Sequence, residues 1–184
     1  LPIYPNAHIA NVATLEELEI ALADATKTII NITEDIETEA KILVSRPVTI
    51  NGGNNAITFT NDADEWQGNY VLHVYNTEDV VIKDIKLTGG DAALLVNGSD
   101  VTLTGAIDVS GNEFGGIESS KGVGLENNPK LTVTDANLTN SSEAYGLPTI
   151  WEDQVTGTVV TGDNQFTTNA EVKTGQVQYY LDAA

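Results

Sequence analysis

The sequence predicts an all-β fold, a single-stranded parallel β-helix (β-solenoid) with an N-terminal capping α-helix. Three observations lead to this prediction. A pair of short strands joined by a polar turn recurs along the chain, one amphipathic segment precedes the first pair, and paired glycines stand between strands. A strand-turn-strand unit that repeats at a recurring period is typical of solenoids, whose units stack on their neighbours.

The repeat consists of an apolar strand followed by a second strand of V-x-I type. Its copies pair residues 42–44 with 48–50, 71–74 with 80–82, 93–96 with 101–103 and, more loosely, 116–118 with 131–133. Val80 and Val101 are 21 residues apart, whereas the steps from Val48 to Val80 and from Val101 to Leu131 span 32 and 30 residues. We expect inserted loops in the longer steps. A β-sandwich is the alternative, because it also has short strands and frequent turns, but it does not predict such a period.

Side-chain alternation within the strands predicts where the core lies. Inward positions of stacked strands should form apolar ladders, while outward positions, many of them threonine, should be solvated. We expect five side chains in these ladders: Val81, Leu94, Leu103, Ile117 and Val133. Gly52 and Gly53 should supply the backbone freedom for a tight corner between strands at 48–50 and 56–59.

A helix is predicted over residues 14–25. Apolar side chains recur there at helical spacing: Leu15, Leu18, Leu22 and Ala25. Thr14 is suited to the N-cap position, and Glu17 stands three residues later, as in a capping box. We interpret this helix as a cap on the open end of one domain, residues 1–184, whose coils and C-terminal cap cover residues 28–181.

The charge balance narrows the classes of partner. The chain has 27 acidic and 8 basic side chains, a net charge of -19, which repels nucleic acid phosphates and anionic lipid headgroups. We therefore predict no nucleic acid binding and no membrane insertion. There is no cysteine, so disulfides and thiolate metal sites are excluded. The start at Leu1 and the absence of methionine lead us to expect that a targeting segment has been removed.

Several segments resemble the pectate-lyase-like adhesive domains of large surface proteins in Gram-positive bacteria. The likeness covers most of the chain and is carried by residues 14–18, 87–91, 95–99, 112–118, 148–151 and 176–181. The resemblance implies a right-handed parallel β-helix in an exported, multidomain protein, secreted or at the Gram-positive cell wall. It implies a non-enzymatic adhesion or spacer module, a monomer that contacts host or cell-wall glycan or protein surfaces and neighbouring domains of its own chain.

The alternative is a polysaccharide lyase or glycoside hydrolase that uses surface carboxylates. A lyase of the pectate type needs an arginine or lysine base, and Arg46 is the only arginine. Since Arg46 stands before Pro47 between two strands, we expect a solvated cation at a corner. Hydrolase candidates are Asp91, Asp108, Glu113, Glu118, Glu152 and Asp153. Chance pairs are expected among 27 acidic residues, so no catalytic residue is predicted.

Ligand and metal candidates remain. Trp66, Tyr145 and Trp151 are candidates for stacking on sugars, although aromatic side chains also fill cores and end caps. Trp66 lies in a polar loop and is expected to be exposed. In the same loop, Asp62, Asp64 and Glu65 could bind Ca²⁺, the one cofactor considered, although a solvated acidic loop is the commoner outcome.

Overall fold

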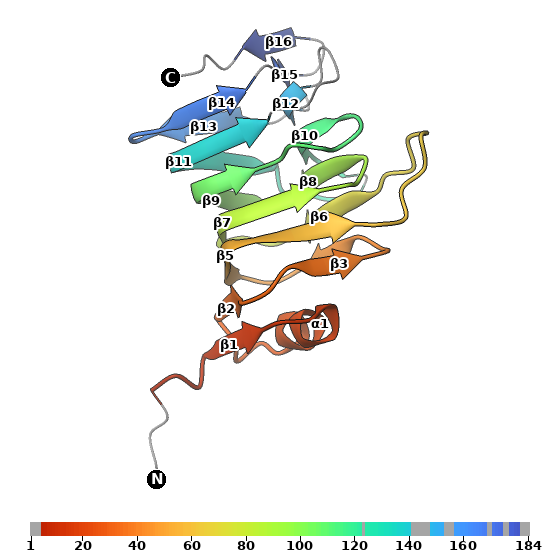
Figure 1. Ribbon diagram of the computed structural model, residues 1–184. Helices are drawn as coiled ribbons and strands as arrows, with labels where there is room; N and C mark the ends of the chain where they lie inside the picture. Colours follow the sequence, from red (N-terminus) through yellow and green to blue (C-terminus); the bar gives the residue numbers. More distant parts are fainter. Residues whose placement is uncertain are drawn as a thin grey trace.

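The chain rises in stacked turns from one N-terminal helix to the last strands (Figure 1). The computed structural model describes residues 5–122, 124–140, 148–152, 157–168, 171–174 and 177–180. As the chain ascends, its strands alternate between a nine-stranded sheet, sheet A, and a seven-stranded sheet, sheet B. Neighbouring strands run parallel, except that β15 and β16 are antiparallel. These parallel sheets agree with the predicted all-β class and with the stacking of a β-helix.

Both sheets follow the order of the chain. Sheet A contains β1 (Ile9–Val12), β2 (Ile29–Ile32), β5 (Val48–Phe59), β7 (Val80–Thr88), β9 (Asp100–Asp108), β11 (Lys130–Asn140) and β13 (Gly157–Thr161), with β3 (Ile36–Thr38) paired to β5 and β14 (Gln165–Thr168) paired to β11. Sheet B contains β4 (Ile42–Val44), β6 (Tyr70–Tyr75), β8 (Ala92–Asn97), β10 (Gly115–Ser120), β12 (Pro148–Glu152), β15 (Glu171–Thr174) and β16 (Val177–Tyr180).

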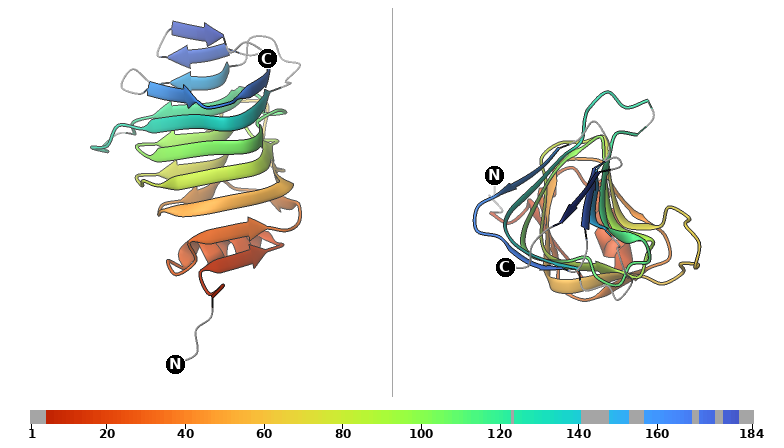
Figure 2. Two further views of the ribbon diagram at one scale, coloured as in Figure 1. Left: turned by 90° about the vertical axis from the view of Figure 1, so that its left-hand side faces the viewer. Right: turned by 90° about the horizontal axis from the view of Figure 1, so that it is seen from above.

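Strand register confirms the predicted repeat. Val48 pairs with Val80, Val80 with Val101, and Val101 with Leu131, which is the predicted phase of the second strand. The two longer steps contain residues 60–69, between β5 and β6, and residues 121–129, between β10 and β11. Residues 60–69 and the described residues of the second segment, 121–122 and 124–129, project from the ring of coils when the molecule is seen from above (Figure 2). The insertions therefore lengthen loops and leave the stacking intact.

Each long strand of sheet A bends once, and the bends of successive coils lie at matching positions along the strands. Residues with positive φ mark the bend: Asn54 (60°), Asp84 (50°), Gly105 (72°) and Asp135 (47°). The predicted separate strands at 48–50 and 56–59 are therefore one strand, β5, whose register shifts between Asn51 and Asn55. A Cβ atom on Gly52 would lie 2.3 Å from the carbonyl oxygen of Asp84, so the close approach of the next coil requires glycine here.

The core is a column of stacked apolar side chains between the sheets. Leu94, Leu103, Ile117 and Val133 are at most 2% exposed, as predicted. Val81 is not part of the core. Its neighbours Val80 and Ile82 point inward, and Val81 therefore lies on the outer face of sheet A, where it is half-buried.

Helix α1 (Leu15–Ala23) lies at the N-terminal end of the core; it begins one residue later and ends two residues earlier than predicted. Thr14 is its N-cap and accepts a hydrogen bond from the Glu17 amide at 3.2 Å. The helix connects β1 to β2, which are parallel neighbours in sheet A, and so takes the place that a sheet B strand has in later coils. Leu18 and Ala21 are buried against the first coils. Strand β1, which has no counterpart in the predicted strands, extends sheet A beyond the first repeat.

Arg46 closes the other end of this helix. Its guanidinium donates hydrogen bonds of 2.7 Å to the carbonyl oxygens of Ala21 and Leu22, in the last turn of α1. The Ala21 carbonyl also accepts a hydrogen bond of 3.2 Å from the amide of the C-cap residue Asp24, and a cation beside the carbonyls of the last turn is favoured by the helix dipole. The prediction of a solvated corner cation is therefore wrong. The single arginine of the chain is a half-buried structural cap.

Candidate functional site

The outer face of sheet B is built by strand alternation and parallel register. In β6 the side chains of Leu72 and Val74 point into the core, so His73 and Tyr75 point outward. Register then aligns outward positions of successive coils. We call the following residues the sheet B outer face: Leu43, His73, Leu95 and Glu118 in one column, Tyr75 and Asn97 in a second, and Tyr70 in a third. Tyr70 is outward because the alternation is interrupted at Val71, which lies in the core, and Tyr70 packs in a cluster with Leu95 instead.

This face is more apolar than the rest of the described surface. Four large hydrophobic side chains are exposed among the described residues, and Ile20 is the one on helix α1. The other three gather at sheet B: Leu43 is 52% exposed and Tyr75 38%, while Trp66, 47% exposed, lies in the loop that enters β6. Apolar groups clustered on one surface, bordered by polar groups, are typical of binding sites.

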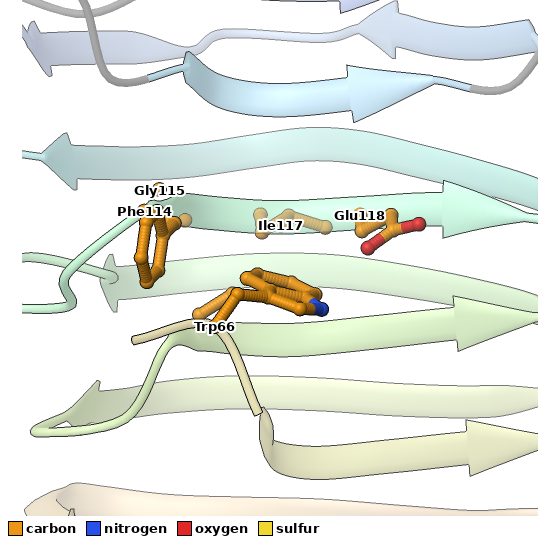
Figure 3. A pocket seen from close by; sticks show the side chains of 7 residues that line it. Trp66, Phe114, Gly115, Ile117 and Glu118 are labelled. Atoms are coloured by element: carbon orange, nitrogen blue, oxygen red, sulfur yellow. The ribbon is translucent and has the colours of Figure 1, made fainter. Parts of the chain in front are cut away.

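Trp66 is fixed by two other aromatic rings. It meets Tyr70 edge-on, with 5.6 Å between ring centroids, and Phe114 edge-on at 5.5 Å. Its indole ring lies on the outer side of sheet B beside Phe114, with Glu118 further along β10, whereas the Ile117 side chain points to the core behind that strand (Figure 3). The hollow between them has a volume of about 10 Å³, room for about one water molecule. The indole is therefore a supported, half-exposed platform, in agreement with the exposure predicted for Trp66.

Tyr70 and Glu118 form a polar pair beside this platform. The Tyr70 hydroxyl donates a hydrogen bond to the Glu118 carboxylate. Burial raises the pKa of Tyr70 well above its ordinary value, and the Glu118 carboxylate raises that pKa further. The phenol therefore remains protonated, and it holds the Glu118 carboxylate in one position next to the exposed indole.

A second polar group lies at the opposite ends of the strands. The amide Nδ2 of Asn97 is 3.2 Å from Nε2 of His73, and Asn97 Oδ1 accepts a hydrogen bond of 2.7 Å from the Gly122 amide. Because Oδ1 is held by Gly122, Nδ2 donates, and His73 accepts as a neutral imidazole. Burial lowers the pKa of His73 to about 4, and the positive charge of Lys41 also lowers it. The His73 ring packs edge-on against Tyr75, at 5.7 Å between centroids.

The two inserted loops border this face. Residues 60–69 precede β6 and lie at the start of the sheet B strands, while residues 121–122 and 124–129 follow β10 at their end. Gly98, after β8, is packed so closely under the second loop that a Cβ atom would lie 2.7 Å from a Leu125 methyl carbon. The face is therefore bounded along the strand direction and continues from coil to coil.

Three acidic side chains form a separate group where the Trp66 loop (residues 60–69) meets the turns before β8 and β10. Carboxylate oxygens of Asp62, Asp91 and Glu113 lie within 4.8 Å of one another, and we call these residues the acidic cluster. Burial raises the pKa of the Asp62 carboxyl, and the charge of Asp91 adds to that effect. The pKa of Glu113 is raised by partial desolvation and by Asp62, Asp64 and Asp91.

The predicted site residues have different places. Trp66 belongs to the aromatic platform, and Asp62 to the acidic cluster, whereas Asp64 and Glu65 are exposed outside that cluster. The backbone of Trp151 is in register with Glu118, but its side chain and all of Tyr145 lie outside the described residues. Leu43, His73 and Tyr75 are not among the predicted site residues. Leu43 and His73 lie between inward residues of recognised repeat units, which was the available signal, and Tyr75 directly follows the unit at residues 71–74.

Three of the six carboxylates weighed for catalysis accept hydrogen bonds within the protein. Asp91 is fully buried, and its Oδ2 accepts hydrogen bonds from the amides of Gln67 (2.7 Å) and Asn69 (2.9 Å). Asp108 accepts from the Ser110 amide, and Glu118 from Tyr70. The side chain of Glu152, and all of Asp153, lie outside the described residues.

Comparisons with known proteins place the chain by family. A family model described as "Putative pectate lyase-like adhesive domain" matches residues 9–179. No curated protein and no solved structure matches the chain. In the described part of the chain, no helix combines the length and the apolar character needed to cross a membrane.

Proposed function

The chain belongs to the family of pectate lyase-like adhesive domains, and from this premise we propose that it is a non-catalytic binding module of a larger secreted bacterial protein. Its ligand is a neutral glycan that lies across the sheet B outer face. The scaffold in this proposal is a right-handed β-solenoid that carries the face at the bacterial surface, toward host or cell-wall glycans.

The observation that carries the proposal is the combination of side chains on one rigid sheet. Trp66 and Tyr75 offer exposed aromatic surface near the two ends of the strands. Between them lie a fixed carboxylate, Glu118, and a neutral imidazole, His73. A sugar has apolar ring faces and a rim of hydroxyl groups, so it is complementary to aromatic rings interspersed with fixed hydrogen-bonding groups.

Net charge selects among glycans. At -19, the protein repels polyanionic chains such as de-esterified pectin, at long range and at low salt most strongly. Glu118 also places a negative charge within the face itself. A neutral glycan has no such penalty, and its hydroxyl groups can donate to the carboxylate.

We propose no catalytic turnover because the described arginine and the buried Asp91 carboxylate have structural roles. Arg46, the only arginine, donates its guanidinium hydrogen bonds to the carbonyls of Ala21, Leu22 and Pro47. Asp91 is inaccessible to a polymer because it is fully buried. Catalysis by a carboxylate pair requires two groups that reach the same glycosidic bond from opposite sides, and Glu118 is the one carboxylate in the described part of the face.

A glycan array followed by calorimetry tests the proposal. We expect saturable binding to a neutral glycan, with an affinity lowered about tenfold or more by Trp66→Ala or Tyr75→Ala, because each change removes an aromatic platform. Ile20→Ala is the matched control, since it removes an even more exposed apolar side chain from helix α1. The control should bind with unchanged affinity.

Two results would contradict the proposal. Binding of protein surfaces but of no glycan would assign the same face to a protein ligand. Degradation of a polysaccharide, abolished by replacement of one carboxylate, would show an enzyme. The wild-type protein should therefore also be incubated with the bound glycan and its products measured.

A further inference from the structure

We propose that the acidic cluster of Asp62, Asp91 and Glu113 is a divalent cation site, of the calcium class, that fixes the Trp66 loop. The site itself is independent of glycan binding. Only its consequence for the platform rests on the proposed function.

The cluster is a product of coil stacking. Asp62 comes from the loop before β6, Asp91 from the turn before β8, and Glu113 from the turn before β10. Backbone hydrogen bonds stack these turns: the Asp91 amide donates to Asn69 O at 2.9 Å, and the Phe114 amide donates to Asp91 O at 2.8 Å. Three carboxylates from three successive coils are thereby brought to one point.

Asp91 supplies an independent indication of a ligand. Its side chain is 0% exposed, and its Oδ1 atom is buried without a hydrogen-bond partner in the described structure. A buried carboxylate oxygen without a donor is costly, and the Asp91 carboxylate also lies close to two further carboxylates that repel it. A cation between the three groups would remove both costs.

The spacing fits one calcium ion. Oxygen ligands of calcium lie about 2.3–2.6 Å from the metal, so two ligands of one ion are at most about 5.2 Å apart. The carboxylate oxygens here lie within 4.8 Å of one another. Calcium accepts six to eight oxygen ligands in flexible geometry, so water can complete the shell on the side of half-buried Asp62 and Glu113.

The site would clamp the Trp66 loop at both ends. Asp62 lies near the start of the loop, and the loop's last residues, Gln67 and Asn69, donate their amides to Oδ2 of Asp91. The Asn69 side chain also donates to Asp62 Oδ1 at 2.9 Å. A cation that joins Asp62 to Asp91 therefore ties the two ends together, and Trp66 lies in the segment between them.

Thermal unfolding of the metal-free protein, with and without calcium, tests the site. At about 10 mM, calcium chloride should raise the melting temperature by about 5 °C more than sodium chloride of equal ionic strength, for a dissociation constant near 10⁻⁴ M. The excess should vanish in Glu113→Gln and in Asp91→Asn. In Asp91→Asn the new amide can donate to the neighbouring carboxylates, so this variant should also be more stable than wild type without calcium.

The matched control is the double variant Asp64→Asn, Glu65→Gln, which removes two exposed charges from the same loop outside the cluster. It should keep the full calcium response, and calorimetry should show one calcium ion bound. An equal response of the wild type to both salts, or a loss of the response in the control, would overturn the site and leave the carboxylates as a diffuse acidic coat.

Glycan affinity with calcium and with chelator tests the consequence for the platform separately. Chelator should weaken binding in the wild type and leave Asp91→Asn unaffected. Calcium binding without any glycan binding would overturn the proposed function alone, whereas glycan binding without calcium binding would overturn the cation site alone.

Discussion

The two sheets have equivalent inner faces and different outer faces. Inside, sheet A stacks Val48, Val80, Val101 and Leu131, and sheet B stacks Ile42, Leu72, Leu94 and Ile117, all of them buried. Outside, sheet A aligns Thr49, Val81, Thr102 and Thr132, whereas sheet B aligns Leu43, His73, Leu95 and Glu118. The same coils therefore carry a polar, threonine-rich face and a face of mixed aromatic, apolar and ionisable groups.

This difference separates stability from function. Threonine on a solvated strand needs no further explanation, because it is a favoured strand residue. Exposed Leu43 and Tyr75 contribute little to burial, and the proposed binding role would account for their place on the sheet that also carries Trp66. The inner ladders, in contrast, are required in every coil. Changes at inward and outward positions should therefore have sharply different effects.

The largest expected effect is that of Leu94→Asp. Leu94 is 1% exposed in the inner ladder, so the substitution places an unpaired carboxylate in the core and should destabilise the fold by about 4 kcal/mol or more. Leu43→Asp is the matched change at an outward position of the same sheet, where the side chain is 52% exposed, and should cost less than about 1 kcal/mol. Denaturant unfolding measures both. Similar losses in the two variants would contradict the assignment of inner and outer faces.

A smaller and opposite effect is expected at Ser119. This residue follows Val96 in an inner ladder of sheet B, is 0% exposed, and has a hydroxyl without a partner in the described structure. Ser119→Ala removes an unsatisfied polar group and should raise the free energy of unfolding by about 1 kcal/mol. Ser120→Ala, at the adjacent outward position, is the control and should have no stabilising effect. A loss of stability in Ser119→Ala would show that the hydroxyl is satisfied within the folded protein.

The fold was predictable because coil stacking imposes a period on the sequence. The phase of Val80 and Val101, and the loops in the longer steps, could be inferred from spacing alone. Val81 was misplaced because a run of three apolar residues, Val80 to Ile82, does not reveal which members point inward. The sequence predicts two strands where β5 is one bent strand, because a pair of glycines can mark either a corner between two strands or a bend within one. Arg46 could not be assigned because its partners lie 24 and 25 residues away in α1.

The candidate site was less predictable, since it depends on contacts between coils. Trp66 could be recognised as exposed from its polar surroundings, but nothing local indicates that Phe114 and Tyr70 support it. Asp62 was selected with its sequence neighbours Asp64 and Glu65, whereas the structure groups it with Asp91 and Glu113. In a stacked fold, residues about one coil apart in the sequence become neighbours in space. Asp91 and Glu113 are separated by about one coil, so a search for acidic residues at that separation would have paired them.

The smallest expected effect is a pH dependence that belongs to the sheet B outer face. Because the pKa of His73 is about 4 in the folded protein and near 6.5 in the unfolded chain, the unfolded chain binds the proton first as pH falls. The stability that His73 contributes as a neutral side chain is therefore present above about pH 6.5 and is lost as pH falls toward 4. Because the imidazole is partly exposed, the loss should be less than about 1 kcal/mol.

Comparison of the wild type with His73→Gln isolates this contribution from the carboxylates. The pKa values of Asp62 and Glu113 are raised, so their protonation favours the folded state at low pH and opposes the effect of His73 in the wild type. These carboxylates are the same in both proteins, and their contribution cancels in the difference between the two melting temperatures. That difference should shift in favour of His73→Gln as pH falls from 7 to 4.5. A difference that stays constant over this range would contradict the neutral, acceptor state of His73, and with it the hydrogen bond from Asn97 that helps to fix this end of the face.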